Sequence, residues 1–244
     1  LWEDKKGLFD AIKSAEVLVV RNRTQVTAEL LKSAPKLKVI ARAGVGLDNI
    51  DIKAADEAGV VVVAGLGANA VSVAELTLGL ALSLKRGIVQ QDFLTKSGKW
   101  IRTPGREISG STWGLLGCGA TGRATAILLK GFECKVIGYD PIFNGNEYIE
   151  MRTWDDVISS SDIISLHMPA NSETINSINQ SVFAKMRNDA VIINVGRGEL
   201  INESDLISAL ENKVIAGAAL DVRVVEPPTV GKLEKIDNLI LTPH

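Results

Sequence analysis

The stretch GLLGCGATGRATA, residues 114–126, contains the glycine pattern Gly117-x-Gly119-x-x-Gly122. In loops of this kind the first glycine allows a tight turn, the second lets a pyrophosphate approach the backbone, and the third lets the following helix pack closely on the strand. The start of that helix presents backbone N–H groups and the positive end of the helix dipole to an anion. The chain has 22 glycines, so the pattern alone is weak evidence and its surroundings have to be considered.

Three features around this loop strengthen its interpretation. An apolar strand is predicted before it, at residues 112–117, and a helix follows it. The next predicted strand, residues 134–140, ends in Asp140, about 20 residues beyond Gly117, where a carboxylate can bind the 2′-hydroxyl of a ribose. The alternative is an ordinary strand–turn–helix without a ligand. Together the three features favour a dinucleotide-binding unit.

The rest of the chain alternates short apolar runs with helical patterns, which is typical of an α/β fold with a parallel sheet. The apolar runs are continuous, which indicates strands covered on both faces. Strands are predicted at residues 16–20, 38–44, 60–65, 112–117, 134–140, 162–167, 190–196, 215–222 and 238–242. The last six match the number of strands in a complete dinucleotide-binding sheet.

We expect two domains, residues 1–70 and 71–242. The second opens with the longest predicted helix, 71–86, whose apolar surface indicates a position between domains or between subunits. The stretch 96–112 is rich in glycine, serine and charge and is predicted to be a loop. The first domain begins on a helix although a doubly wound domain normally opens with a strand, so we expect its first strand to be missing from this chain.

Composition excludes several classes of protein. The net charge of −2, with acids and bases well mixed, argues against a nucleic-acid-binding surface. No apolar run approaches 18 residues, so no membrane span is expected. Cys118 and Cys134 show neither metal-ligand spacing nor a disulfide framework, so no metal is expected, and two free thiols fit a reducing cytoplasm.

Charged residues at predicted strand ends are candidates for chemistry, because ligands of open parallel sheets bind beyond the carboxyl ends of the strands. Arg197 lies there between two glycines and could pair with a carboxylate, although a solvated loop arginine is the simpler interpretation. Glu226 lies in a proline-rich turn. His244 and His167 each end a predicted strand, and the residues alone do not decide which of the two would be an acid–base group.

Four segments, in their order and approximate spacing, closely resemble the D-2-hydroxyacid dehydrogenases, and the phosphoglycerate dehydrogenase branch most of all. The resemblance extends over essentially the whole chain. It implies a flavodoxin-like substrate-binding domain, truncated here, followed by a Rossmann NAD-binding domain. The segments are ARAGVGLDNID (41–51), GLLGCGATGR with GYDP (114–123 and 138–141), INVGRGELINESDL (193–206), and ALDVRVVEPP with LTPH (219–228 and 241–244).

The resemblance implies a reversible hydride transfer between the nicotinamide of NAD and C2 of a 2-hydroxy or 2-keto acid. In it, Arg197 matches the substrate-binding arginine, Glu226 the carboxylate that orients the histidine, and His244 the acid–base. In the family more chain follows this histidine and returns to the substrate domain, so we expect this chain to be a fragment. His167 then becomes a residue beside the adenosine loop.

The cofactor-binding residues that the resemblance implies lie in both predicted domains. They are Val45, Gly117, Gly119, Ala120, Thr121, Gly122, Asp140, Met168, Val195, Gly196, Arg197 and Asp221. We expect NAD rather than NADP, because Asp140 would repel a 2′-phosphate and residues 141–143 offer no arginine to bind it.

A phosphate at the far end of the substrate, as in 3-phosphoglycerate, is predicted from three further arginines that match the phosphoglycerate dehydrogenase branch. A phosphate dianion attracts several cationic donors, although arginines at a protein surface are usually only solvated. The substrate-binding residues implied are Arg21, Arg42, Gly44, Val45, Gly46, Arg102 and Arg197. Arg102 could act across a homodimer, which the apolar helix 71–86 also suggests.

The sequence departs from the family pattern at two places. The glycine loop has ATG where RIG is usual, and Arg223 stands where phenylalanine is common. Four alternatives remain open. One is another D-2-hydroxyacid dehydrogenase, either a glyoxylate/hydroxypyruvate reductase or a D-lactate dehydrogenase. A formate dehydrogenase has glutamine as the partner of the histidine, so Glu226 argues against it. A corepressor that senses NAD(H) and keeps the same triad, and an inactive dinucleotide-binding fragment, are the other two.

Overall fold

The computed structural model describes residues 3–244 and divides into two compact units, Leu1–Asn69 (unit 1) and Ala70–His244 (unit 2). The boundary lies one residue before the expected one, and the long helix belongs to unit 2. Residues 1–2, part of the first predicted helical segment, lie outside the described residues. Each unit is described by itself below.

Unit 1 is a three-stranded parallel sheet with three short helices. The strands are β1 (Val17–Val20), β2 (Val39–Arg42) and β3 (Val61–Ala64), in the order β1-β2-β3. The helices are α1 (Lys5–Ile12), α2 (Ala28–Lys32) and α3 (Ile52–Glu57), and each begins at a side-chain cap, Asp4, Thr27 or Asp51. Such caps satisfy backbone N–H groups at the start of a helix.

The expectation that strands are covered on both faces is wrong for unit 1. Successive residues of a strand point to opposite faces. Val20 and Ile40 share one buried cluster with residues of α1, α2 and α3. On the other side, Val19 is 68% exposed and Val61 is 58% exposed. The helices of unit 1 therefore cover one face of its sheet and leave the other open.

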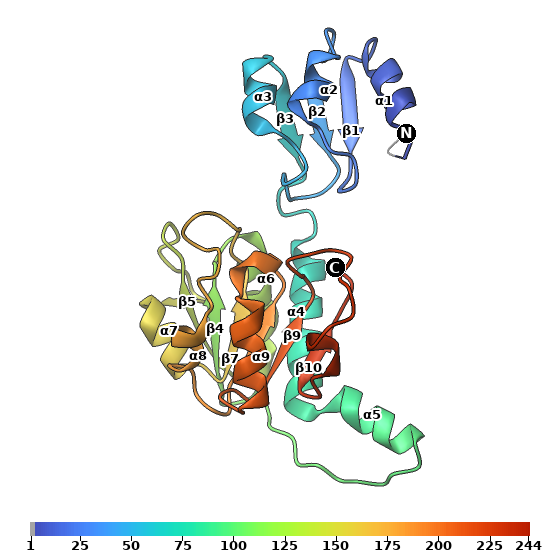
Figure 1. Ribbon diagram of the computed structural model, residues 1–244. Coiled ribbons are helices and arrows are strands. Elements are labelled where there is room, and N and C mark those ends of the chain that lie inside the picture. Colours follow the sequence, from blue (N-terminus) through green and yellow to red (C-terminus); the bar gives the residue numbers. More distant parts are fainter. Residues whose placement is uncertain (1–2) are drawn as a thin grey trace. The chain divides into compact units, whose positions relative to one another are not determined.

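Unit 2 is built on a parallel sheet of seven strands in the order β10-β9-β8-β7-β4-β5-β6 (Figure 1). The chain starts in the middle at β4, builds outward to one side, and then crosses to β7 and builds to the other side, which is the Rossmann arrangement. The strands are β4 (Thr112–Leu116), β5 (Lys135–Tyr139), β6 (Glu150–Met151), β7 (Ile163–Leu166), β8 (Val191–Asn194), β9 (Gly217–Leu220) and β10 (Leu239–Leu241). The predicted fold class is confirmed, and β6 is a two-residue edge strand that was not predicted.

Helices cover both faces of this sheet. Helices α4 (Ala70–Arg86) and α6 (Ala120–Leu129) contribute to one buried cluster, with Trp113 of β4 and Ile193 of β8. Helices α7 (Trp154–Ser160), α8 (Gln180–Phe183) and α9 (Glu203–Glu211) contribute to a second cluster on the opposite face. Three 3₁₀ turns complete the unit: η1 (Lys130–Phe132), η2 (Gly198–Leu200) and η3 (Leu233–Lys235).

An unpredicted helix, α5 (Ile88–Lys96), follows α4 and projects from it away from the sheet of unit 2 (Figure 1). It buries no residue, and the stretch 97–111 that follows contains no helix or strand. Large apolar side chains of this arm are exposed, among them Phe93 (70%) and Trp100 (80%). Among residues 3–244, no helix combines the length and apolar character needed to cross a membrane, and no three or more histidine, cysteine, aspartate or glutamate side chains are grouped so that they could hold a metal ion.

Candidate active site

One edge of the sheet of unit 2 gathers residues from distant parts of the sequence. Every neighbouring pair of strands in this sheet is parallel, so the carboxyl ends of the strands lie together. The predicted residues that directly follow these ends, or come within three residues of them, are Gly117, Gly119, Asp140, His167, Met168, Val195, Gly196, Arg197, Asp221 and His244.

The glycine loop has the shape that its spacing predicts. Gly117 has a φ of +96°, and a Cβ there would lie 2.7 Å from the backbone of His167, so this position needs glycine. A Cβ on Gly122 would lie 2.3 Å from the carbonyl oxygen of Gly117, so the helix can approach the strand only without a side chain. A Cβ on Gly119 would meet no atom within 4 Å. The space beside Gly119 is open to a ligand.

Helix α6 begins immediately behind this open space. Gly119 is its N-cap residue and provides no side-chain hydrogen bond to it, and Ala120 and Thr121 are its first residues. An N-terminus without a side-chain cap offers its N–H groups and the positive end of the dipole to an anion. The loop and helix therefore fit the pyrophosphate of a dinucleotide.

Asp140 follows β5 and accepts three backbone hydrogen bonds. Its Oδ2 accepts from Cys118 at 2.8 Å, and its Oδ1 accepts from Ile142 at 2.9 Å and from Phe143 at 3.0 Å. Burial acts to raise the pKa of Asp140, but these donors and the nearby Arg123 lower it below its ordinary value. A carboxylate can accept about four hydrogen bonds, so capacity remains for a ribose hydroxyl.

Arg123 is a feature of this corner that sequence reasoning missed. Its Nη1 donates to the carbonyl of Cys118 at 3.0 Å, and its guanidinium lies 5.5 Å from the ring centre of Phe143. The prediction of NAD rested on residues 141–143, which contain no arginine. Because arginine side chains are long, one on the helix after the glycine loop can reach the same place.

The Arg197 loop is shaped by two glycines and by Asn194. A Cβ on Gly196 would lie 2.9 Å from the carbonyl oxygen of Met168, and one on Gly198 would lie 2.1 Å from the backbone of Arg223. Asn194 is 1% exposed; its Nδ2 donates to the carbonyl of Arg197 at 2.8 Å, and its Oδ1 accepts from the N–H of Gly196 at 3.1 Å. A buried asparagine that bonds the loop on both sides was not predicted, although its position directly before the loop was a possible signal.

Glu226 and His244 form a hydrogen-bonded pair. The Nδ1 of His244 lies 2.6 Å from Oε2 of Glu226, and the histidine side chain is 51% exposed. The end of β10 is fixed to β9 by Thr242, whose hydroxyl donates to Oδ1 of Asp221 at 2.7 Å. The structure thus brings together two residues that are 18 positions apart in sequence, and leaves Nε2 of His244 as the ring nitrogen that is not bonded to Glu226.

His167, the competing acid–base candidate, has a different environment. Trp113 Nε1 donates to Oγ of Ser165 at 2.8 Å, and that hydroxyl lies 3.0 Å from Nε2 of His167. Burial lowers the pKa of His167 to about 3, so the ring is neutral at physiological pH. Its Nδ1 has no hydrogen-bond partner among residues 3–244. A histidine that resists protonation is unsuited to donate a proton at neutral pH.

The predicted substrate-binding residues of unit 1 follow its strands. Arg21 comes directly after β1 and is exposed. Arg42 ends β2 and turns back on its own loop: its Nε donates to the carbonyl of Gly46 at 2.9 Å, and its Nη1 donates to that of Ala43 at 3.0 Å. Arg42 therefore shapes the loop that contains Gly44 and Val45. Arg102 lies in the exposed stretch after α5, in unit 2.

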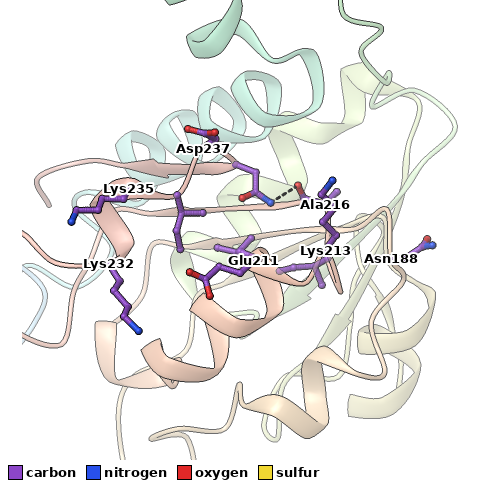
Figure 2. A pocket seen from close by; sticks show the side chains of 11 residues that line it. Asn188, Glu211, Lys213, Ala216, Lys232, Lys235 and Asp237 are labelled. Carbon is purple, nitrogen blue, oxygen red and sulfur yellow. Dashed lines mark hydrogen bonds between the residues drawn. The ribbon is translucent and has the colours of Figure 1, made fainter.

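A hollow of about 710 Å³ lies elsewhere in unit 2 (Figure 2). Ala216 and Asn238, which line it, come directly before β9 and β10, so it lies at the amino ends of these strands, opposite to the glycine loop. The amide of Asn238 donates to the carbonyl of Ala216 at 3.1 Å, and Lys213 and Lys232 are among the side chains around it. None of the predicted site residues lines this hollow, so we place the candidate site at the other edge.

Comparison with known proteins identifies the family to which the chain belongs. Residues 78–244 match the family model described as D-isomer specific 2-hydroxyacid dehydrogenase, NAD binding domain. The chain is 42% identical to a D-3-phosphoglycerate dehydrogenase of Methanocaldococcus jannaschii, over 98% of this chain and 47% of the relative. It is 40% identical to a hydroxypyruvate reductase of Thermotoga maritima, over 99% of this chain and 81% of the relative.

Among solved structures, D-lactate dehydrogenase from Aquifex aeolicus, complexed with NAD and lactic acid, is similar with a TM-score of 0.85 and 28% identity, over 96% of this chain and 77% of that one. The chain spans about half the length, 47%, of the D-3-phosphoglycerate dehydrogenases it matches first. The chain belongs to the D-isomer specific 2-hydroxyacid dehydrogenases and includes the NAD-binding domain of that family.

Proposed function

We propose that this chain forms the catalytic part of an NAD-dependent oxidoreductase that transfers hydride between nicotinamide and C2 of a D-2-hydroxy acid or its 2-keto form. The observation that carries the proposal is the 2.6 Å contact between His244 Nδ1 and Glu226 Oε2, at the same sheet edge as the glycine loop. A histidine that is oriented by a carboxylate can act as a general acid or base.

One group of residues would bind the cofactor. NAD, when bound, supplies or accepts the hydride. The N–H groups of Ala120 and Thr121 would hold its pyrophosphate, and Asp140 would bind its ribose. Met168 would lie beside the adenosine, and Val195 and Asp221 would lie near the nicotinamide. The carboxylate Oδ1 of Asp221 is already bonded to Thr242, which holds this position at the end of β9.

Substrate binding and proton transfer would fall to a second group. Arg197 would bind the substrate carboxylate through two parallel hydrogen bonds, and the backbone N–H groups of Gly44, Val45 and Gly46 in unit 1 would assist it. Because Nδ1 of His244 is bonded to Glu226, its Nε2 would donate the proton to the C2 oxygen during reduction. The negative charge of Glu226 would stabilise the imidazolium before transfer.

For the substrate itself we propose an acid with a terminal phosphate, such as 3-phosphoglycerate. Arg21, Arg42 and Arg102 would bind the phosphate. Two of the five N–H donors of Arg42 are used within its own loop, and the others are those proposed for the phosphate. The D-3-phosphoglycerate dehydrogenases among the relatives support this choice.

We also propose that the protein is a homodimer. The arm formed by α5 and the residues after it exposes Phe93, Trp100 and Ile101, the last at 55%. Exposed apolar side chains gathered on one segment are typical of an interaction surface. Replacing Phe93 and Trp100 with glutamate should give monomers in sedimentation measurements, and an unchanged dimer would show that this arm is not the interface.

The test of the function is a panel of 2-keto acids with NADH. We expect phosphohydroxypyruvate to have a higher kcat/KM than hydroxypyruvate, pyruvate and glyoxylate. Arg42→Ala should lower kcat/KM for phosphohydroxypyruvate more than for hydroxypyruvate. Lys53→Ala, which removes an exposed side chain from α3 of the same unit, should change neither. Equal losses for both substrates would contradict the phosphate assignment, and no reduction of any keto acid would contradict the hydride transfer.

A further inference from the structure

Arg223 is anchored by its side chain between two glutamates. Its Nε donates to Oε1 of Glu203 at 3.0 Å, and its Nη1 donates to Oε1 of Glu234 at 2.7 Å. Glu203 lies in the first turn of α9, and Glu234 lies in η3. The arginine side chain is only 12% exposed. The three residues, which we call the Arg223 clamp, therefore tie the turn after β9 to two other elements.

The backbone of the same residue holds Glu226. The N–H of Arg223 donates to Oε1 of Glu226 at 2.9 Å, while the other oxygen, Oε2, contacts Nδ1 of His244 at 2.6 Å. Glu226 can thus keep its orientation toward His244 only while this N–H stays in place. The side chain of Arg223 fixes where that N–H lies.

The Arg197 loop rests on the same backbone. A Cβ on Gly198 would lie 2.1 Å from the carbonyl carbon and 2.3 Å from the carbonyl oxygen of Arg223. A shift of residue 223 toward the loop is therefore blocked, and a shift away would remove its support. The position of Arg223 affects both the residue proposed to bind substrate and the pair proposed to transfer the proton.

The chemistry of the clamp suits a fixed anchor. Arginine stays charged at any physiological pH and presents its donors in a rigid planar fork. The hydrogen bond from Arg223, together with one from the N–H of Gly231, lowers the pKa of Glu234 to about 2. Val224 adds a backbone N–H to Oε1 of Glu203 at 3.4 Å. Phenylalanine, common at this position in the family, could make neither of the two side-chain bonds that Arg223 makes to Glu203 and Glu234.

We propose that Arg223 is a positioning residue: through the clamp it holds the backbone N–H that orients Glu226, and through Glu226 it orients His244. The inference rests on the proposed function for its kinetic consequences. Its structural part, the dependence of the His244 environment on the side chain of Arg223, holds or fails independently of turnover.

The kinetic test is a double-mutant cycle in the full-length protein with NADH and its best keto acid. Arg223→Met keeps length and removes the charge, and Glu226→Gln removes the carboxylate that Arg223 would act through. We expect Arg223→Met to lower kcat about 10-fold with little change in KM, as for a group that affects the transition state alone. In the Glu226→Gln background it should lower kcat no further, because residues that act as one unit are not additive.

Two further variants separate positioning from general damage. Arg187→Met removes an arginine that pairs with Asp162 and Asp189 outside the clamp, and should leave kcat unchanged. Arg223→Lys should restore only part of the lost rate, because one ammonium cannot reproduce the fork. Fully additive losses in the double mutant would overturn the proposal, as would a kcat for Arg223→Met equal to that of the parent.

Nuclear magnetic resonance of imidazole-labelled protein supplies a readout without turnover. The His244 signal is assigned by its loss in His244→Asn. We expect its nitrogen chemical shifts to change in Arg223→Met and to stay the same in Arg187→Met. If Arg223→Met does not fold, Glu234→Gln can replace it, because it removes one side of the clamp. It should change the His244 signal in the same direction but by a smaller amount. An unchanged His244 signal in a folded clamp variant would overturn the inference, whereas a parent without keto-acid turnover would contradict only the proposed function.

Discussion

The glycine loop and a second region, formed by Arg197, Glu226 and His244 with the residues that hold them, lie at the same edge of the sheet, but the two keep their shapes by different means. The glycine loop keeps its shape because its glycines have no side chain, since Gly122 can approach the carbonyl of Gly117 only without a Cβ. The second region depends on side chains that are present, such as Asn194 and Arg223, which bond to backbone and carboxylates. Single substitutions can therefore test the glycine loop one position at a time. In the second region a substitution at one residue also affects the residues bonded to it.

The largest expected effect is that of removing the proposed acid in the second region. His244→Asn should lower kcat for keto-acid reduction about 10²–10⁴-fold, because positioned proton transfer contributes about that much. NADH affinity, measured by fluorescence titration, should stay close to that of the parent, since the glycine loop and Asp140 are untouched. A variant that keeps nearly all of its kcat would show that another group supplies the proton.

Two substitutions in the glycine loop should separate folding from cofactor binding. Gly122→Ala places a Cβ 2.3 Å from a carbonyl oxygen, and should lower the free energy of unfolding by about 1–3 kcal/mol, as for an overpacked core. Gly119→Ala meets no protein atom within 4 Å, so stability should change by less than about 1 kcal/mol, while NADH binding weakens. Chemical denaturation and NADH titration of both variants test this contrast, and equal stabilities would contradict it.

The cofactor corner can be altered at Asp140. Asp140→Ser should reduce the preference for NADH over NADPH by about 10-fold or more, the factor that corresponds to roughly 1.4 kcal/mol, because a negative charge near the 2′-phosphate is lost. Arg123, which lies near Asp140, would then be the partner of that phosphate. The ratio of kcat/KM for NADPH to kcat/KM for NADH measures the change. This ratio should rise in Asp140→Ser and should be lower again when Arg123→Ala is added.

The smallest effect concerns stability in acid. The pKa of Glu234 falls from an ordinary 4.5 to about 2, chiefly through the hydrogen bond from Arg223. A carboxylate with a lowered folded-state pKa stabilises the protein above the unfolded value, and this contribution is lost as the pH falls toward the folded value. The difference in thermal midpoint between the parent and Arg223→Met should therefore shrink between pH 4.5 and pH 2. A difference that is constant over this range would show that Glu234 is not the partner responsible.

The same contrast explains what the sequence could predict. Strands such as Val191–Asn194 are buried along their whole length, so their continuous apolar runs predicted both the elements and the edge where ligands would bind. The glycine loop was predictable because its geometry excludes side chains at fixed spacings. The first strand, β1, has the same kind of apolar run, yet Val19 is exposed. The prediction failed there because the hydrophobicity of a strand does not show which elements cover each face of the sheet.

Other features had no local pattern to reveal them. Strand β6 has two residues, and α5 buries none, so neither shows a periodicity. The Arg223 clamp joins residues 203, 223 and 234 through contacts that only the fold creates. The sequence marked Arg223 as a departure from the family pattern but could not indicate its partners. Arg123 was missed for a similar reason, since it approaches Asp140 from a different element.

The proposed transfer of hydride to C2 of a keto acid can be followed directly with an isotope label. The full-length protein would be incubated with NADH labelled with deuterium at the reactive C4 position and with phosphohydroxypyruvate, and the product analysed by mass spectrometry and nuclear magnetic resonance. We predict deuterium at C2 of the D-2-hydroxy acid, in proportion to the NADH oxidised. NADH that binds but transfers deuterium to no member of the keto-acid panel would contradict the account and would favour a protein that only senses the dinucleotide.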